Sequence, residues 1–138
     1  MSAKILIVDD DPEMVELLGL ALTEAGYSPR AATTGREAIA EAQRLSPDLV
    51  ILDLLLPDLN GFSVCEDLRR QPGTASVPII MITGLAGRFP RLVGVEMGVN
   101  AYVNKPFQTQ ELVSCVDVLL RKSGAAPDPV KDLRKLAA

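Results

Sequence analysis

Short apolar runs alternate with helical patterns along most of this 138-residue sequence. The clearest runs are continuous and rich in Ile, Leu and Val, which is typical of strands buried on both faces. The runs cover residues 4–8, 27–32, 48–53, 77–82 and 101–103. Apolar residues at helical spacing follow each run, over residues 12–25, 34–45, 62–70, 88–97 and 109–122. The sequence therefore predicts five strands and five helices in strict alternation.

This alternation indicates one fold class. Strands joined through helices form a parallel sheet with right-handed crossovers, and the helices cover both of its faces. Five strands are too few for the closed eight-stranded barrel that the same alternation can build. We therefore expect an α/β fold, a doubly wound (βα)5 three-layer sandwich around a parallel five-stranded sheet. Sheets of this kind bind ligands beyond the carboxyl ends of their strands.

Residues at the helix starts support these boundaries. Asp11 is a suitable N-cap for the first helix, and Pro12 suits its first turn. Gly26 is placed where that helix should stop. Thr34 can cap the second helix, with Glu37 three residues later as its capping-box partner.

Two stretches depart from the regular pattern. The helix expected at 88–97 contains Pro90 and Gly94, and a glycine inside a helix costs about 1 kcal/mol relative to alanine, so we expect a short or mobile helix. Residues 1–120 carry 9 basic and 16 acidic side chains, whereas residues 121–138 carry 5 and 2. We expect one domain over residues 1–122 and a C-terminal tail or linker stub over residues 123–138.

Composition excludes several classes of function. The sequence contains no histidine, which rules out Ser-His-Asp and Cys-His catalysis, imidazole metal ligands and a histidine pH switch within this chain. Its net charge of −4 argues against nucleic acid or an anionic membrane as a direct partner. No apolar stretch approaches the ~18 residues that span a bilayer. We expect a cytoplasmic protein.

Chemistry-bearing residues follow four of the predicted strands. Because parallel strands end at the same edge of a sheet, these residues should converge there. Acids that meet in a crevice repel one another unless a cation neutralises them. The residues are Asp9, Asp10 and Asp11 after the first run, Asp53 after the third, Thr83 and Gly84 after the fourth, and Lys105 and Pro106 after the fifth.

Three carboxylates without histidine or thiolate would make an all-oxygen site, which favours Mg²⁺. A lysine near the metal can pair with an incoming anion, and a hydroxyl and a glycine amide can donate hydrogen bonds to the same anion. A carboxylate nucleophile, Mg²⁺, lysine and hydroxyl together indicate phosphoryl transfer to an aspartate.

The sequence resembles the receiver domains of two-component response regulators, including the chemotaxis receiver. The resemblance covers about residues 3–122 and implies a flavodoxin-like fold with strand order 2-1-3-4-5. It also implies a protein that catalyses only its own phosphorylation and dephosphorylation. The matching pieces are ILIVDDDP (5–12), PDLVILDLLLPDLNG (47–61), VPIIMITG (77–84) and NAYVNKPF (100–107).

The resemblance also implies a role for each matching residue. Asp53 would be the phospho-acceptor and a Mg²⁺ ligand. Asp10 would bind Mg²⁺ directly, Asp9 through water, and Leu55 through its backbone carbonyl. Lys105 would contact the phosphoryl oxygens, held by a cis peptide bond before Pro106. The remaining residues would form the phosphate-binding switch, namely Thr83, Gly84 and Tyr102.

The implied donor is a sensor histidine kinase or a histidine phosphotransfer protein. Phosphorylation would change the face made by the fourth helix, fifth strand and fifth helix, which would signal to an unknown output partner and is a candidate homodimer surface. One alternative is a pseudo-receiver, a binding module that works without phosphorylation. Another is a Mg²⁺-dependent hydrolase of the haloacid dehalogenase type, but residues 9–13 lack the Thr or Val that ends its DxDx[TV] motif.

Overall fold

The computed structural model describes residues 2–84, 93 and 96–121. The helix expected at 88–97 lies largely outside these residues, although the Met97 N–H donates to the Val93 carbonyl with helical spacing, at 2.9 Å. The expected tail lies outside them as well. The elements are β1 (Lys4–Val8), α1 (Pro12–Glu24), β2 (Ser28–Ala32), α2 (Gly35–Leu45), β3 (Leu49–Asp53), α3 (Gly61–Arg70), β4 (Ile79–Thr83), β5 (Ala101–Asn104) and α5 (Thr109–Arg121).

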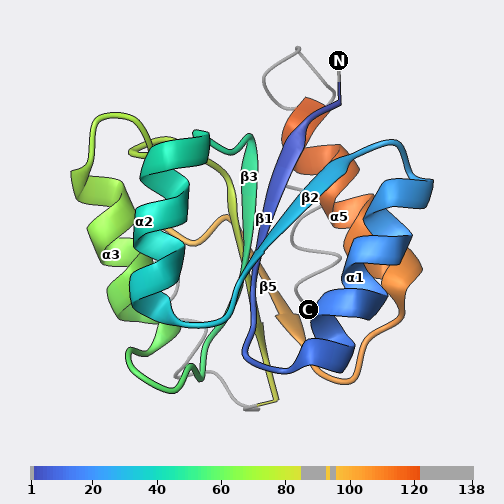
Figure 1. Ribbon diagram of the computed structural model, residues 1–138, viewed down its shortest axis with the longest axis horizontal. Helices are drawn as coiled ribbons and strands as arrows, with labels where there is room; N and C mark the ends of the chain where they lie inside the picture. Colours follow the sequence, from blue (N-terminus) through green and yellow to red (C-terminus); the bar gives the residue numbers. More distant parts are fainter. Residues whose placement is uncertain (1, 85–92, 94–95, 122–138) are drawn as a thin grey trace.

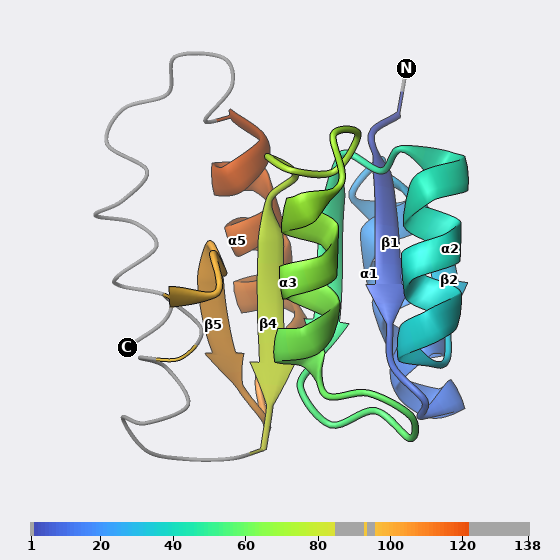
Figure 2. The same ribbon diagram turned by 90° about the vertical axis from the view of Figure 1, so that its left-hand side faces the viewer.

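The five strands form one parallel sheet in the order β2-β1-β3-β4-β5. Helices α2 and α3 cover one face, and α1 and α5 cover the other (Figure 1). Figure 2 looks onto the α2 and α3 face and shows the sheet behind these helices. The predicted doubly wound α/β fold and its strand order are confirmed.

Both faces of the sheet are buried, which explains the continuous apolar runs of the sequence. Successive residues of a strand point to opposite faces, so each strand contributes to two core layers. Ile5, Ile7 and Ile51 pack with α1 and α5, whereas Leu6 and Val50 pack with α2 and α3. Within the residues described, no helix combines the length and hydropathy needed to cross a membrane.

The predicted helix caps are present. The Asp11 side chain accepts a hydrogen bond from the Glu13 N–H at 3.0 Å, at the start of α1. The Thr34 side chain accepts one from the Glu37 N–H at 3.1 Å, at the start of α2. The return bond of this capping box falls one residue early, because the Glu37 carboxylate accepts from the N–H of Thr33 at 3.2 Å.

Strand β4 begins two residues later than the apolar run predicts. Pro78 has no N–H to donate to the ladder, and the Val77 carbonyl accepts a hydrogen bond from Arg69 Nη1 at 2.7 Å. Regular pairing therefore starts at Ile79 and continues to Thr83. The apolar character of Val77 reflects burial rather than strand pairing.

Arg69 fastens the end of α3 to the chain that enters β5. Its guanidinium donates to the Gly98 carbonyl at 2.8 Å and to Asn100 Oδ1 at 2.9 Å. Burial lowers the pKa of this half-buried arginine. Gly98 has a φ of +87°, and a Cβ there would lie 2.9 Å from Arg69 Nε, so both the backbone conformation and the contact favour glycine at this position.

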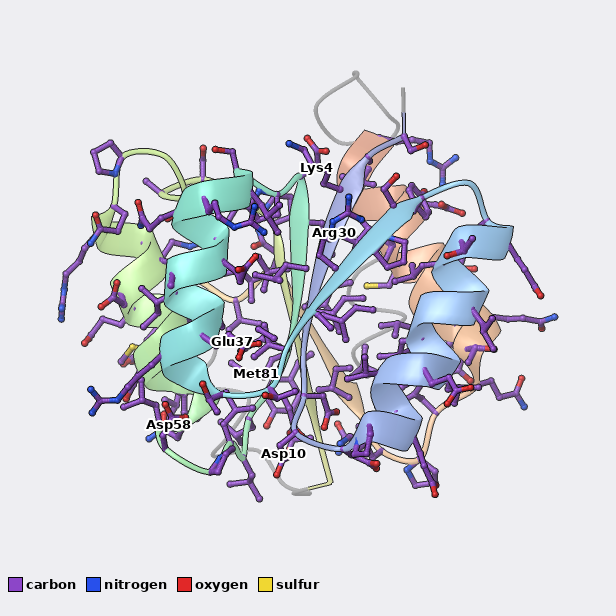
Figure 3. The ribbon with its side chains drawn as sticks, in the orientation of Figure 1. Lys4, Asp10, Arg30, Glu37, Asp58 and Met81 are labelled. Atoms are coloured by element: carbon purple, nitrogen blue, oxygen red, sulfur yellow. The ribbon has the colours of Figure 1, made fainter. Side chains whose placement is uncertain are left out.

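Strand β2 forms one edge of the sheet. Pro29 lies in this strand and has no N–H, which edge strands tolerate. The Pro29 carbonyl accepts a hydrogen bond from the guanidinium of the next residue, Arg30, at 3.0 Å. Arg30 is exposed and lies on β2 in Figure 3.

Tyr27 joins the start of β2 to α5 through a hydrogen bond that its hydroxyl donates to Asp117 Oδ1. Burial raises the pKa of Tyr27, and the hydrogen bond and charge of Asp117 raise it further, to about 12. The neutral hydroxyl is therefore the form that the folded protein favours.

This pKa predicts a loss of stability at high pH. The contribution of Tyr27 is complete below its ordinary pKa of 10.0 and is lost as the pH rises toward about 12. Tyr27→Phe should lower the free energy of unfolding by about 1 kcal/mol at neutral pH, and this deficit should shrink above pH 10. Urea unfolding of both proteins from pH 7 to 11.5 measures it. A deficit that stays constant over this range would contradict the assignment.

Candidate functional site

Acidic side chains from two strand ends meet at the carboxyl edge of the sheet. Asp9 and Asp10 follow β1, and Asp53 ends β3, which lies next to β1. Each of the three offers a carboxylate oxygen, and these oxygens lie within 4.8 Å of one another. Figure 3 places Asp10 at this edge and Lys4 at the opposite one.

Lys105, which follows β5, reaches two of these carboxylates. Its Nζ lies 3.2 Å from Asp53 Oδ2 and 3.4 Å from Asp9 Oδ2. The side chains of Asp9 and Asp53 are 2% and 9% exposed, whereas that of Lys105 is 27% exposed. A single partly accessible ammonium thus bridges two buried carboxylates.

Backbone N–H groups hold the two buried carboxylates in the same way. Asp9 Oδ1 accepts from the Asp11 N–H at 2.9 Å, and Asp53 Oδ1 accepts from the Leu55 N–H at 3.2 Å. Each carboxylate therefore has one oxygen on the backbone two residues later and the other on Lys105. This pairing fixes the direction in which both carboxylates face.

The electrostatics of the site leave an excess of negative charge. Burial raises the pKa of Asp9, the Asp11 N–H opposes this, and the charge of Asp53 adds to it. Burial alone would lower the pKa of Lys105, but Asp53 and Asp9 together outweigh it and raise that pKa. Lys105 is therefore charged at neutral pH and cannot by itself neutralise three carboxylates.

The donor set fits a hard divalent cation. The clustered ligand atoms are carboxylate oxygens, which Mg²⁺ prefers, and Asp10 is exposed to solvent. Among the residues that the structure describes, this is the one group of three acidic or cysteine side chains close enough to hold an ion together.

The other predicted site residues lie at or near the same edge. Thr83 is fully buried at the end of β4, and its carbonyl accepts from the Lys105 N–H at 2.7 Å. The Lys105–Pro106 peptide bond is cis. Gly84 is exposed and follows Thr83 directly. Tyr102 lies further back, buried inside β5 in the core layer under α2 and α3.

Gly61 is a site residue that the sequence patterns do not single out. A Cβ at this position would lie 2.7 Å from the Asp53 carbonyl oxygen and 2.8 Å from Met81 Sδ. The Asn60–Gly61 pair indicates a loop, but Gly61 is also the first residue of α3. Asn60 caps that helix by accepting from the Ser63 N–H at 2.9 Å. Only a residue without a side chain lets α3 begin this close to Asp53.

Residues 5–117 match the family model of the response regulator receiver domain. The chain belongs to this family. The match spans β1 to α5 and includes every acidic residue of the cluster.

Two curated proteins to which this chain is similar are named as transcriptional regulators. It is 40% identical over 128 residues to the DNA-binding dual master transcriptional regulator RpaA of Synechocystis sp.. It is also 40% identical over 126 residues to the alkaline phosphatase synthesis transcriptional regulatory protein PhoP of Bacillus subtilis. These matches cover 93% and 91% of this chain but 53% and 52% of the relatives. The chain spans about half the length of the curated relatives it matches.

Solved structures agree with the family. A putative response regulator from Chloroflexus aurantiacus is 40% identical, with a TM-score of 0.83 over 87% of this chain and 98% of that chain. The chemotaxis response regulator CheY4 of Vibrio cholerae is 30% identical, with a TM-score of 0.82 over 86% of this chain and 99% of that chain. The whole receiver fold is therefore shared with known response regulators.

The close approach at Gly61 predicts a strong effect of a single methyl group. Gly61→Ala should lower the free energy of unfolding by about 2 kcal/mol, because its nearest neighbour is backbone that cannot move aside. Gly19→Ala is the matched control, since nothing lies within 4 Å of a Cβ there and alanine favours the helix by about 0.5–1 kcal/mol. Urea unfolding compares the two. Equal stability of both variants would overturn this reading of the contact.

The raised pKa of Asp9 predicts a substitution that increases stability, in contrast to Gly61→Ala. A carboxyl whose folded pKa lies above its unfolded value stabilises the fold at low pH and loses that contribution as the pH rises. Asp9→Asn should therefore be more stable than the wild type at pH 7, in buffer with a metal chelator. The gain should vanish below the ordinary pKa of 3.8. Thermal unfolding at pH 3 to 7 checks this, and a gain independent of pH would contradict it.

Proposed function

We propose that this receiver domain accepts a phosphoryl group on Asp53, in a Mg²⁺-dependent reaction, from the phosphohistidine of a sensor histidine kinase or a histidine phosphotransfer protein. The arrangement of Asp53 carries the proposal. Its carboxylate is buried, fixed by a backbone N–H, within 3.2 Å of Lys105 and clustered with two further carboxylates. This combination suits a nucleophile better than a structural ion pair, because it concentrates negative charge where a cation and an anion can both bind.

The residues of the site have distinct roles in the proposed transfer. Asp53 attacks phosphorus, a P–O bond forms, and the P–N bond to the donor imidazole breaks with its electrons returning to the ring. Asp10 and Asp53, the Leu55 carbonyl and, through water, Asp9 would hold Mg²⁺. When bound, the ion would neutralise charge on the transferring group. The Lys105 ammonium pairs with the phosphoryl oxygens as charge builds on them.

Phosphorylation would then bias a conformational equilibrium. The new group carries roughly −1.5 to −2 charges and three acceptor oxygens. The hydroxyl of Thr83 and the N–H of Gly84 are the donors proposed to bind it. Movement of Thr83 would allow Tyr102 in β5 to move, which changes the face made by residues 88–97, β5 and α5. That face is proposed to contact the output partner or a second copy of the chain.

The proposal extends to the organisation of the chain. Residues 1–122 form the receiver domain, and residues 123–138 form a tail or linker stub. The domain acts in the cytoplasm, takes phosphate once per cycle rather than turning over a substrate, and does not itself contact nucleic acid or membrane. Its acidic net charge of −4 supports the last point.

Incubation with acetyl phosphate and Mg²⁺, followed by intact-protein mass spectrometry, tests this function. The wild type should gain the mass of one phosphoryl group, and the gain should be lost on adding a chelator. Asp53→Asn, which keeps the size of the side chain, should gain nothing. An unmodified wild type would instead indicate a pseudo-receiver that binds partners without phosphate. Steady release of phosphate with no stable adduct would indicate a hydrolase.

A further inference from the structure

The loop between β3 and α3, residues 54–60, carries Leu55 and leads directly from Asp53. Its two limbs are joined at the base. The Gly61 N–H donates to the Leu54 carbonyl at 2.6 Å, and Leu55 forms an isolated antiparallel bridge with Asn60. The loop thus projects from the sheet as a closed unit, whose tip lies near residue 58.

Asp58, at this tip, is bound to the first turn of α2. Its Oδ1 accepts from the Gly35 N–H at 2.7 Å, and its Oδ2 accepts from the Arg36 N–H at 3.0 Å. Oδ1 also accepts from the Leu59 N–H at 2.9 Å, which fixes the carboxylate within its own loop. Figure 3 places Asp58 at the same edge of the molecule as Asp10.

Packing reinforces this attachment. A Cβ at Gly35 would lie 2.9 Å from Leu59 Cβ and 3.0 Å from Val64 Cγ2, so the loop and α3 rest directly on the backbone of α2. The Gly35 N–H, helped by the other backbone donors, holds the pKa of Asp58 below its ordinary value despite some burial. The carboxylate is therefore ionised at neutral pH, when it accepts these bonds most strongly.

Two side chains cap the start of α2, one from the chain that enters the helix and one from a distant loop. Thr34 accepts from the N–H of Glu37, and Asp58 accepts from those of Gly35 and Arg36. Both satisfy backbone donors that a helix end leaves free. Thr34 belongs to the chain that enters α2, whereas Asp58 is 23 residues away from Gly35 and belongs to the loop beside Asp53.

We propose that Asp58 is a positioning residue for the phospho-acceptor site: by binding the first turn of α2 it holds the 54–60 loop, and through it Leu55 and Asp53, in the geometry that binds Mg²⁺. The proposal rests on the metal-dependent function proposed above. Leu55 is the link, because its N–H donates to Asp53 Oδ1 and its carbonyl is the proposed metal ligand. A residue that orients a metal ligand affects affinity without touching the metal.

Three variants distinguish the positioning of the loop by Asp58 from its capping of α2 and from the effect of its charge. Asp58→Ala removes all of the anchoring bonds. Asp58→Asn removes the charge and the bond from the Arg36 N–H, but keeps an oxygen for the Gly35 and Leu59 donors. Thr34→Ala removes a cap from the same helix end without touching the loop. Asp58→Ala should weaken Mg²⁺ binding about tenfold, as expected when the support of a metal ligand is lost. Asp58→Asn should keep most of the affinity, and Thr34→Ala should keep all of it.

Magnesium affinity can be measured by following the amide signals of the site in ¹H–¹⁵N NMR spectra during titration with MgCl₂. Hydrogen exchange without metal gives a second, independent readout. The Leu55 and Gly61 amides do not bond to Asp58, so their exchange reports on the base of the loop. Exchange of both should be about tenfold faster in Asp58→Ala than in the wild type, and unchanged in Thr34→Ala.

Each contrary result has a distinct meaning. Wild-type Mg²⁺ affinity and exchange in Asp58→Ala would overturn the proposal, since Asp58 would then be a cap alone. Equal losses in Asp58→Ala and Asp58→Asn would also overturn it, because the bonds to Gly35 and Leu59 that asparagine keeps would then do nothing to hold the loop. If the wild type itself bound no Mg²⁺, the proposed function would fail, and exchange at Leu55 and Gly61 would still decide whether Asp58 holds the loop.

Discussion

Two buried carboxylates share one lysine in this receiver domain, and much of the structure serves to keep them together. Asp9 directly follows β1 and Asp53 ends the neighbouring strand β3, so the pairing of these strands brings the two carboxylates close. Lys105, which follows β5, reaches both, and its backbone N–H donates to the Thr83 carbonyl at the end of β4. Their mutual repulsion opposes folding, and the two apolar layers around the sheet supply the free energy that holds them in place.

The sequence was sufficient for the fold class because the central strands β1, β3 and β4 are buried on both faces. The short, β-branched run at residues 5–8 is typical of a buried strand, and the acidic triplet that follows it marks the carboxyl edge of the sheet. Parallel pairing then places the acids and the lysine at the same edge, and the strand order that brings them together is implied by the family resemblance. Strand limits were less certain: Val77 is buried like a strand residue, yet its carbonyl is bound by Arg69 rather than by a neighbouring strand. The roles of Thr83 and Tyr102 come from the family resemblance and not from any pattern in the residues.

Contacts made at the tips and starts of elements could not be predicted. In the sequence, the Asn60–Gly61 pair indicates only a loop. The close approach of the Asp53 carbonyl, which leaves no room for a Cβ at Gly61, is seen only in the folded chain. No sequence pattern predicts the role of Asp58. Apart from the adjacent Leu59, the amides that it binds are in the first turn of α2, more than 20 residues earlier in the chain. Both contacts depend on how closely α2, α3 and the strand ends approach one another. These distances between elements are set by packing, and no periodic pattern in the sequence predicts them.

The edge of β2 has a consequence for aggregation. An exposed strand edge is a template on which another chain can add a strand, and soluble proteins block it in recognisable ways. At Pro29 an incoming strand would meet no N–H, and it would find the carbonyl already bound by the Arg30 guanidinium. The same guanidinium would have to give up its exposure to water. Residues 29 and 30 therefore oppose the addition of another strand at this edge of the sheet.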